Sequence, residues 1–188
     1  MSKIKPLTDE EFVAFSLSPR TLEFIEDYRI GNGLKKEDMN ILDWGCGRGR
    51  SVLWLREQGY NAFGLDVGEE VINNGLQLFR VKGYTDSVLR LLMPDGRADF
   101  QDNYFHYTFS NQVFEHVRDI DSVAGEIARV TKVGGIGFHV YPSHRRIVEG
   151  HLYMPFVHWM PKNVMRKYLV ALYVLVGIEP KWQFLSGA

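Results

Sequence analysis

Short apolar runs alternate with segments of helical periodicity along most of this 188-residue chain. The apolar runs have the length of strands, the third being the weakest, and they span 39–44, 61–67, 87–93, 104–111 and 136–142. The helical patterns are closed by glycines and span 50–59, 69–83 and 120–135. This alternation predicts an α/β fold of the Rossmann-like, doubly wound type, in which a mostly parallel sheet carries helices on both faces.

Two capping patterns predict helices ahead of this alternation. Thr8 and Glu11 have the spacing of a capping box, which predicts a short helix near the N-terminus. Ser18 followed by Pro19 matches an N-cap residue and the first helical position, and predicts a second helix that extends to about Tyr28. We therefore assign residues 1–38 to N-terminal helices that precede the core.

Composition and charge narrow the class of protein. Hydrophobic residues make up 45% and charged residues 24% of the chain, as in an ordinary globular domain. The net charge of −1 provides no strong basic field, so no nucleic-acid partner is expected. The single cysteine excludes an internal disulfide, and the N-terminus lacks the apolar run of a secretory signal. Both features predict a cytoplasmic location.

The longest apolar stretch, residues 168–178, is too short to cross a membrane. A membrane-spanning helix needs about 18 or more apolar residues, so no transmembrane segment is expected. We predict a core helix here. An interfacial helix is the alternative, because Lys162, Arg166 and Lys167 precede the stretch.

Three alternating glycines follow the first core strand. Residues 43–50 read Asp-Trp-Gly-Cys-Gly-Arg-Gly-Arg. A tight turn alone needs one glycine, so three at alternate positions indicate that a ligand also approaches the backbone. A phosphate-binding loop requires Gly-Lys-Ser/Thr, and no lysine is present here. A dinucleotide-binding turn requires glycine or alanine where Arg50 stands, which weakens that interpretation without removing it.

This stretch resembles motif I of the class I S-adenosylmethionine-dependent methyltransferases, whose pattern is D-x-G-x-G-x-G. Asp43, Gly45, Gly47 and Gly49 match that pattern position by position. Three further segments are similar to the family in order and spacing, and they span 64–68, 109–117 and 126–140. The resemblance covers about residues 39–142 and is greatest to the type 11 methyltransferases that act on small molecules.

The chemistry of the cofactor agrees with this resemblance. Asp66 follows Gly45 by 21 positions, near the ~20 expected for an acid that binds ribose hydroxyls. S-adenosylmethionine carries a positive sulfonium and no phosphate, whereas an acid beside a pyrophosphate would be unfavourable. Asp43 would accept hydrogen bonds from the ammonium of the cofactor or orient the turn.

The resemblance implies that S-adenosyl-L-methionine is the cofactor. In the loop after the third predicted strand, Asp95 is the expected adenine contact, ahead of Asp99 and Asp102. The residues implied in cofactor binding are Asp43, Gly45, Cys46, Gly47, Gly49, Asp66, Val67, Asp95, Gly96, Asn111 and Gln112.

The acceptor side of the reaction is less defined. Three histidines are candidate general bases because the pKa of histidine lies near neutral, namely His106, His116 and His139. The segment after the last core strand can fold over the carboxyl edge of the sheet, where ligands bind in this fold class. The substrate contacts expected there are Tyr141, Arg145, His151, His158 and Trp159.

A metal site is not expected. Some relatives of the family bind a divalent ion through E-x-x-E-H, and Glu115-His116 matches the end of that pattern. Gln112 stands where the first acid is required, so too few charged ligands are available.

We therefore predict one methyltransferase domain over residues 1–188, with a cofactor-binding core over 39–142 and a substrate-side lid and C-terminal helix over 143–188. The expected activity is methyl transfer from S-adenosylmethionine to a small-molecule acceptor. A non-catalytic binding or scaffold protein and, less favoured, a dinucleotide-dependent oxidoreductase are the alternatives. Members of this fold usually finish with an antiparallel strand pair, for which too few residues remain, so that hairpin is predicted to be absent or incomplete. An unfinished sheet edge would favour a homodimer.

Overall fold

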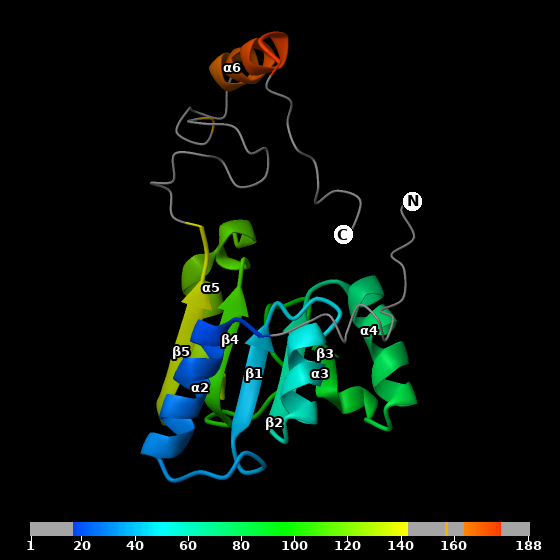
Figure 1. The fold of residues 1–188 in the computed structure, drawn as a ribbon, viewed down its shortest axis with the longest axis vertical. Helices are drawn as coiled ribbons and strands as arrows, with labels where there is room; N and C mark the ends of the chain where they lie inside the picture. The colour runs from blue at the N-terminus through cyan, green and yellow to red at the C-terminus, as the bar shows by residue number, and fades with distance from the viewer. Residues whose placement is uncertain (1–16, 143–156, 158–163, 178–188) are drawn as a thin grey trace. The chain divides into compact units, whose positions relative to one another are not determined.

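The computed structural model describes residues 17–142, 157 and 164–177 (Figure 1). Contacts within the chain divide it into two compact units, residues 1–141 and 142–188, and we describe each unit by itself. The predicted division into N-terminal helices, core and lid stays a prediction.

The first unit is built on one five-stranded sheet. Its strands are β1 (Asn40–Trp44), β2 (Asn61–Asp66), β3 (Leu89–Leu91), β4 (Phe105–Asn111) and β5 (Thr131–Val140). The strand order is β3-β2-β1-β4-β5, and every pair of neighbours is parallel. The sheet confirms the predicted parallel α/β fold. Chain order reverses between β1 and β4, because the chain leaves β3 at one edge and re-enters beside β1.

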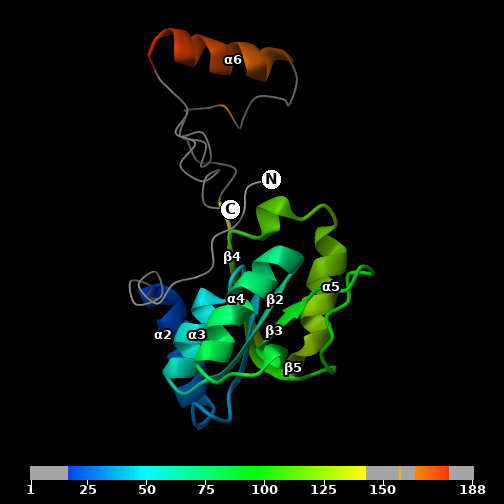
Figure 2. The same ribbon diagram turned by 90° about the vertical axis from the view of Figure 1, so that its right-hand side faces the viewer.

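Helices cover both faces of this sheet, as predicted (Figure 2). Three of them, α2 (Pro19–Gly31), α3 (Arg50–Glu57) and α4 (Glu69–Val81), lie on one face, and α5 (Ile120–Val130) lies on the other. Two short 3-10 helices, η1 (Asp86–Val88) and η2 (Phe114–His116), precede β3 and α5. The predicted cap of α2 is confirmed, since the backbone N–H of Thr21 donates to Ser18 Oγ at 3.1 Å and Pro19 is the first helical residue.

The sheet separates two layers of core. The layer under α2, α3 and α4 contains Ile25, Met39, Ile41, Phe79 and Tyr107. The layer under α5 contains Leu42, Trp44, Leu65, Phe105 and Val130. Because successive side chains of a strand point to opposite faces, residues 41–44 alternate between the two layers. This alternation places Asp43 and Trp44 on different sides of the sheet.

The helix predicted over 120–135 ends five residues early, which corrects the boundary. α5 stops at Val130 and β5 begins at Thr131. Phe105 and Tyr107 of β4 pair with Thr131 and Ile136 of β5. One residue, His106, lies between the pair on β4, whereas residues 132–135 lie between their partners on β5. The two glycines predicted to stop the helix instead form this bulge inside the strand, where Gly134 has a φ of 81°.

α4 packs unusually close to the turn that follows β1. A Cβ atom added at Gly75 of α4 would lie 2.4 Å from the carbonyl oxygen of Arg48 and 3.0 Å from Leu89 Cδ1. A glycine inside a helix is normally unfavourable relative to alanine. Here it allows the backbone of the helix to approach the backbone of the turn.

The described part of the second unit contains α6 (Val164–Leu175), which confirms a helix in the apolar C-terminal stretch. Its predicted place in a core is not confirmed, because none of its described residues is buried and Tyr168, Leu172 and Leu175 are exposed. No helix within the described ranges combines the length and the apolar character needed to cross a membrane. The helix predicted near Thr8 and the predicted incomplete hairpin after α6 lie outside the described residues. The homodimer stays a prediction.

Replacing Gly75 with alanine is expected to lower the free energy of unfolding by about 1–3 kcal/mol, because the added methyl group collides with the Arg48 carbonyl. Gly125→Ala in α5 is a matched control, since a Cβ there meets nothing within 4 Å. That substitution should raise the free energy of unfolding by about 0.5–1 kcal/mol. Urea denaturation followed by circular dichroism measures both values, and stabilisation by Gly75→Ala would contradict the packing argument.

Candidate functional site

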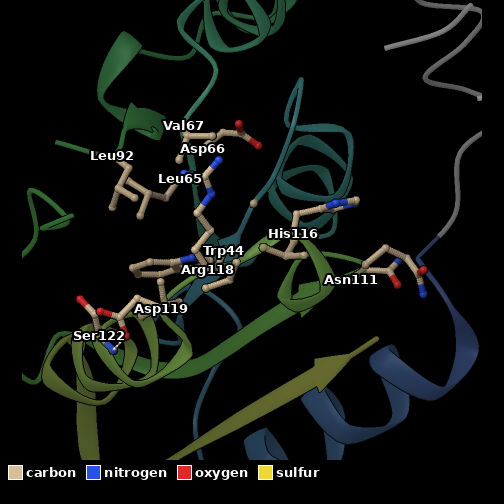
Figure 3. Close-up of a pocket in the computed structure, with 15 residues that line it drawn as sticks. Trp44, Leu65, Asp66, Val67, Leu92, Asn111, His116, Arg118, Asp119 and Ser122 are labelled. Carbon is tan, nitrogen blue, oxygen red and sulfur yellow. Dashed lines mark hydrogen bonds between the residues drawn. The ribbon is translucent and has the colours of Figure 1, made fainter. Parts of the chain in front are cut away.

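A pocket of about 490 Å³ opens at the carboxyl ends of the parallel strands (Figure 3). Its volume is in the range of small-molecule sites, and its place matches the point where strand order reverses, which is where such sheets bind ligands. The residues that line it are Trp44, Gly45, Leu65, Asp66, Val67, Leu92, Asn111, Gln112, Val113, His116, Val117, Arg118, Asp119, Ser122 and Val123.

The three motif glycines have different functions in the turn between β1 and α3. All three have positive φ angles, 78° at Gly45, 55° at Gly47 and 76° at Gly49. A Cβ atom at Gly45 would lie 2.4 Å from a methyl of Val113, and one at Gly49 would lie 2.7 Å from a methyl of Leu89. At Gly47 nothing lies within 4 Å. Only Gly47 therefore leaves open space that a ligand can enter.

Asp66 joins this turn to the end of β2. Its Oδ2 accepts a hydrogen bond from the backbone N–H of Gly47 at 2.8 Å, and its Oδ1 accepts one from Gly68 at 2.9 Å. A carboxylate has about four lone-pair positions, so each oxygen retains capacity for a further donor. Because Asp66 also lines the pocket, it can accept two neighbouring hydroxyl groups of a ligand.

Asp43 lies on the other side of β1 and is 4% exposed. Burial, the largest cause, raises the pKa of Asp43, the side-chain hydrogen bond with Ser51 lowers it, and the nearby charge of Asp66 raises it, so that the resulting pKa is about 7. Asp43 is not among the residues that line the pocket. Of its two predicted functions, orientation of the turn is the one that this geometry favours.

β4 ends in a backbone conformation that few residues adopt. Gln112 has a φ of 57°, in the left-handed region, and its backbone N–H donates to the Val140 carbonyl at 2.7 Å. Non-glycine residues occur there at a cost and often at functional sites. The turn directs Asn111 and Gln112 to the pocket, as the sequence predicts for both.

The structure brings five of the predicted cofactor residues to the pocket, namely Gly45, Asp66, Val67, Asn111 and Gln112. Cys46, Gly47 and Gly49 belong to the adjoining turn. Asp95 and Gly96 form a separate turn after β3, in which Asp95 Oδ1 accepts from the Arg97 backbone N–H at 3.0 Å. Neither Asp95 nor Gly96 lines the pocket.

The three candidate histidines lie in three different places. His116 lines the pocket. His106 lies at the amino end of β4, where its Nδ1 accepts from the Asn40 backbone N–H at 2.9 Å and its Nε2 is 2.8 Å from Lys132 Nζ. Burial and the Lys132 charge lower the pKa of His106. The amino end is opposite the pocket, so this ring is too distant to act as a base there.

His139 lies on β5 and is not among the residues that line the pocket. Its Nδ1 is 2.8 Å from Ser110 Oγ, and its ring packs edge-on against Phe114 with centroids 5.0 Å apart. Burial lowers the pKa of His139. Among the predicted substrate residues, Tyr141 is described and is 59% exposed. Arg145, His151, His158 and Trp159 lie outside the described residues.

Sequence reasoning missed most of the apolar lining and two charged residues. The missed residues are Trp44, Leu65, Leu92, Val113, Val117, Arg118, Asp119, Ser122 and Val123. The sequence did contain a signal for Trp44. Successive side chains of a strand point to opposite faces of the sheet, so Trp44 must lie on the face opposite to Asp43. Within the described ranges, no group of three histidine, cysteine, aspartate or glutamate side chains is arranged to hold a metal ion.

The chain is similar to a known protein family and to curated proteins. The profile of a family described as a methyltransferase domain matches residues 42–138. The chain is 29% identical over 158 residues to a sterol 24-C-methyltransferase of Yarrowia lipolytica, covering 77% of this chain and 40% of that protein. It is 28% identical over 123 residues to a ubiquinone biosynthesis O-methyltransferase of Methylococcus capsulatus, covering 65% of this chain and 49% of that protein. The chain thus spans less than half the length of either relative.

A solved structure supports the fold over a longer region. The crystal structure of a SAM-dependent methyltransferase from Aquifex aeolicus superposes with a TM-score of 0.53, at 18% identity, and covers 86% of this chain and 89% of that one. At this identity the similarity shows the fold alone.

The buried carboxyl of Asp43 predicts a specific pH dependence of stability. Because its pKa rises from 3.8 to about 7, the folded protein holds a proton between these pH values that the unfolded chain has released. The free energy of unfolding of the ligand-free protein should fall across this window by up to about 4 kcal/mol, and this component should be constant above pH 7. Denaturation of wild type and Asp43→Asn at pH 4.5, 6 and 8 measures it.

The Asp43→Asn variant lacks this component, so its free energy of unfolding should change less with pH than that of wild type. Asp27→Asn, at an exposed position of α2, is the control and should retain the wild-type dependence. Equal pH dependence in wild type and Asp43→Asn would refute the burial argument.

Proposed function

The chain belongs to the methyltransferase-domain family, and on that premise we propose that it transfers a methyl group from S-adenosylmethionine to a small-molecule acceptor. One observation carries the proposal: Asp66 holds the Gly47 turn and faces the pocket at the point where strand order reverses. Two relatives of the chain are named as a sterol methyltransferase and a ubiquinone biosynthesis methyltransferase. These names support a small organic molecule as the acceptor.

The residues of the pocket suit two parts of the cofactor, the ribose and the purine. The two Asp66 oxygens have free lone pairs for the ribose hydroxyls, and the open side of Gly47 gives room beside them. Val67 and Leu92 are apolar and line the same pocket, so we assign to them the flat purine that adjoins the ribose. We assign Asp43, which is buried and forms a side-chain hydrogen bond with Ser51, to orientation of the turn.

When bound, S-adenosylmethionine supplies a methyl group that its sulfonium has already activated. The main task of the protein is then to hold the acceptor in line with the carbon–sulfur bond, and such positioning can supply much of the rate. Asn111 and Gln112, at the strained end of β4, are the polar groups that we assign to this task.

His116 is the predicted base that lies in the pocket. When bound, the cofactor would supply the methyl group to the acceptor atom, and its sulfonium would become a neutral thioether. An acceptor oxygen or nitrogen that carries a proton gives that proton to the His116 ring, which a neutral histidine can accept.

Ligand-dependent melting tests the proposal against its alternatives. S-adenosylhomocysteine at 100 times its dissociation constant should stabilise the protein by about 2.7 kcal/mol, whereas NAD and ATP should not. Stabilisation by NAD and none by S-adenosylhomocysteine would overturn the proposal in favour of a dinucleotide enzyme. Binding of S-adenosylhomocysteine without transfer of labelled methyl to a broad panel of small acceptors would favour the scaffold alternative.

Asp66→Asn is expected to weaken S-adenosylhomocysteine binding by about 10- to 100-fold, because hydrogen bonds to a charged acceptor are the stronger ones. Isothermal titration calorimetry measures the affinity, and melting of the ligand-free variant checks its folding. Asp27→Asn is the control for loss of one negative charge and should bind as wild type does. If Asp66→Asn bound S-adenosylhomocysteine with wild-type affinity, Asp66 would be excluded as a ligand of the ribose.

A further inference from the structure

Arg118 introduces a positive charge into the pocket. It lies in the loop between η2 and α5, its side chain is exposed, and it lines the pocket. Figure 3 shows this side chain extending into the pocket, beside Trp44 and toward the wall that Leu65 and Asp66 form. Its guanidinium is thus directed at the space that a ligand would fill.

The two acids of the pocket are engaged by backbone groups. Asp66 accepts from Gly47 and Gly68, and Asp119 caps α5 by accepting from the Ser122 backbone N–H at 3.0 Å. In the part of the chain that the structure describes, no hydrogen bond or ion pair holds the Arg118 guanidinium. The group is therefore available to a ligand.

The charge of the cofactor makes this arrangement informative. S-adenosylmethionine carries a sulfonium and an ammonium against one carboxylate, so a cation in its pocket is unfavourable unless it contacts a part without positive charge. The neighbours of Arg118 indicate which part. Trp44, Leu65, Val67 and Leu92 make this end of the pocket apolar, as suits a flat ring next to the ribose at Asp66.

We propose that Arg118 is a cofactor-positioning residue whose guanidinium stacks on the adenine ring of the bound cofactor. A guanidinium is planar, is weakly hydrated and stacks well on aromatic faces. The exposed stem of Arg118 lets it cover the ring after the cofactor has entered. This inference rests on the proposed function, because it assigns a contact within the same site.

The test compares two ligands that share the adenosyl group. S-adenosylhomocysteine has an amino-acid carboxylate, and methylthioadenosine lacks it. Arg118→Ala should weaken the binding of both by the same factor, about 5- to 30-fold, as measured by calorimetry. Arg118→Lys should recover part of this loss. Arg97→Ala, which removes the same charge from an exposed residue outside the pocket lining, should bind both ligands as wild type does.

A kinetic measurement separates positioning from a structural effect. Arg118→Ala should raise KM for S-adenosylmethionine by a similar factor, leave kcat at saturating cofactor close to wild type, and leave the melting temperature of the ligand-free protein unchanged. A loss of affinity for S-adenosylhomocysteine alone would assign Arg118 to the carboxylate. Unchanged affinity for both ligands with a raised KM for the acceptor would assign it to the acceptor. Either result overturns the adenine contact.

The proposed function fails in a distinguishable way. If wild-type protein binds neither ligand, the methyltransferase assignment of the site and this inference fall together. If wild type binds both and Arg118→Ala binds both equally well, only the inference about Arg118 is overturned.

Discussion

The site depends on the close approach of three backbone segments that glycines make possible. A Cβ atom at Gly64 of β2 would lie 2.6 Å from Cys46 Sγ, and one at Gly75 of α4 would lie 2.4 Å from the Arg48 carbonyl. The turn after β1 is therefore held between β2 and α4. Because β2 carries Asp66 at its end, this packing also fixes the carboxylate that bonds to the Gly47 N–H. The packing that holds the turn in the fold therefore also sets the position of the carboxylate that faces the pocket.

Strand alternation then divides the functions of neighbouring residues. Asp43 points into the layer under α3, where it is almost without water and forms a side-chain hydrogen bond with Ser51, whereas Trp44 points to the opposite layer and lines the pocket. A change of one position in the register of β1 would exchange the two side chains. The parallel pairing of β1 with both β2 and β4 prevents that exchange.

The sequence predicted the features that depend on local chemistry. The strand over 39–44, the N-cap at Ser18 and the closing glycines of α3 and α4 follow from side-chain pattern and allowed φ angles, and the structure has them. The end of α5 was not predictable in this way, because the bulge opposite His106 arises from pairing between β4 and β5. The distance of His106 from the pocket, by contrast, could have been predicted, because the strand expected over 104–111 puts it near the amino end and ligands bind at the carboxyl edge. Arg118 follows no motif and lines the pocket only because the loop before α5 returns to the carboxyl edge.

The position of Trp44 has a spectroscopic consequence. Its indole is 4% exposed and forms part of the pocket wall, whereas Trp54 packs at the edge of the core on the other side of the sheet. A ligand that enters the pocket changes the surroundings of the first indole and leaves those of the second. The chain has four tryptophans, so a variant with phenylalanine in place of Trp54, Trp159 and Trp182 would emit from Trp44 alone, and occupancy could be followed without attaching a dye.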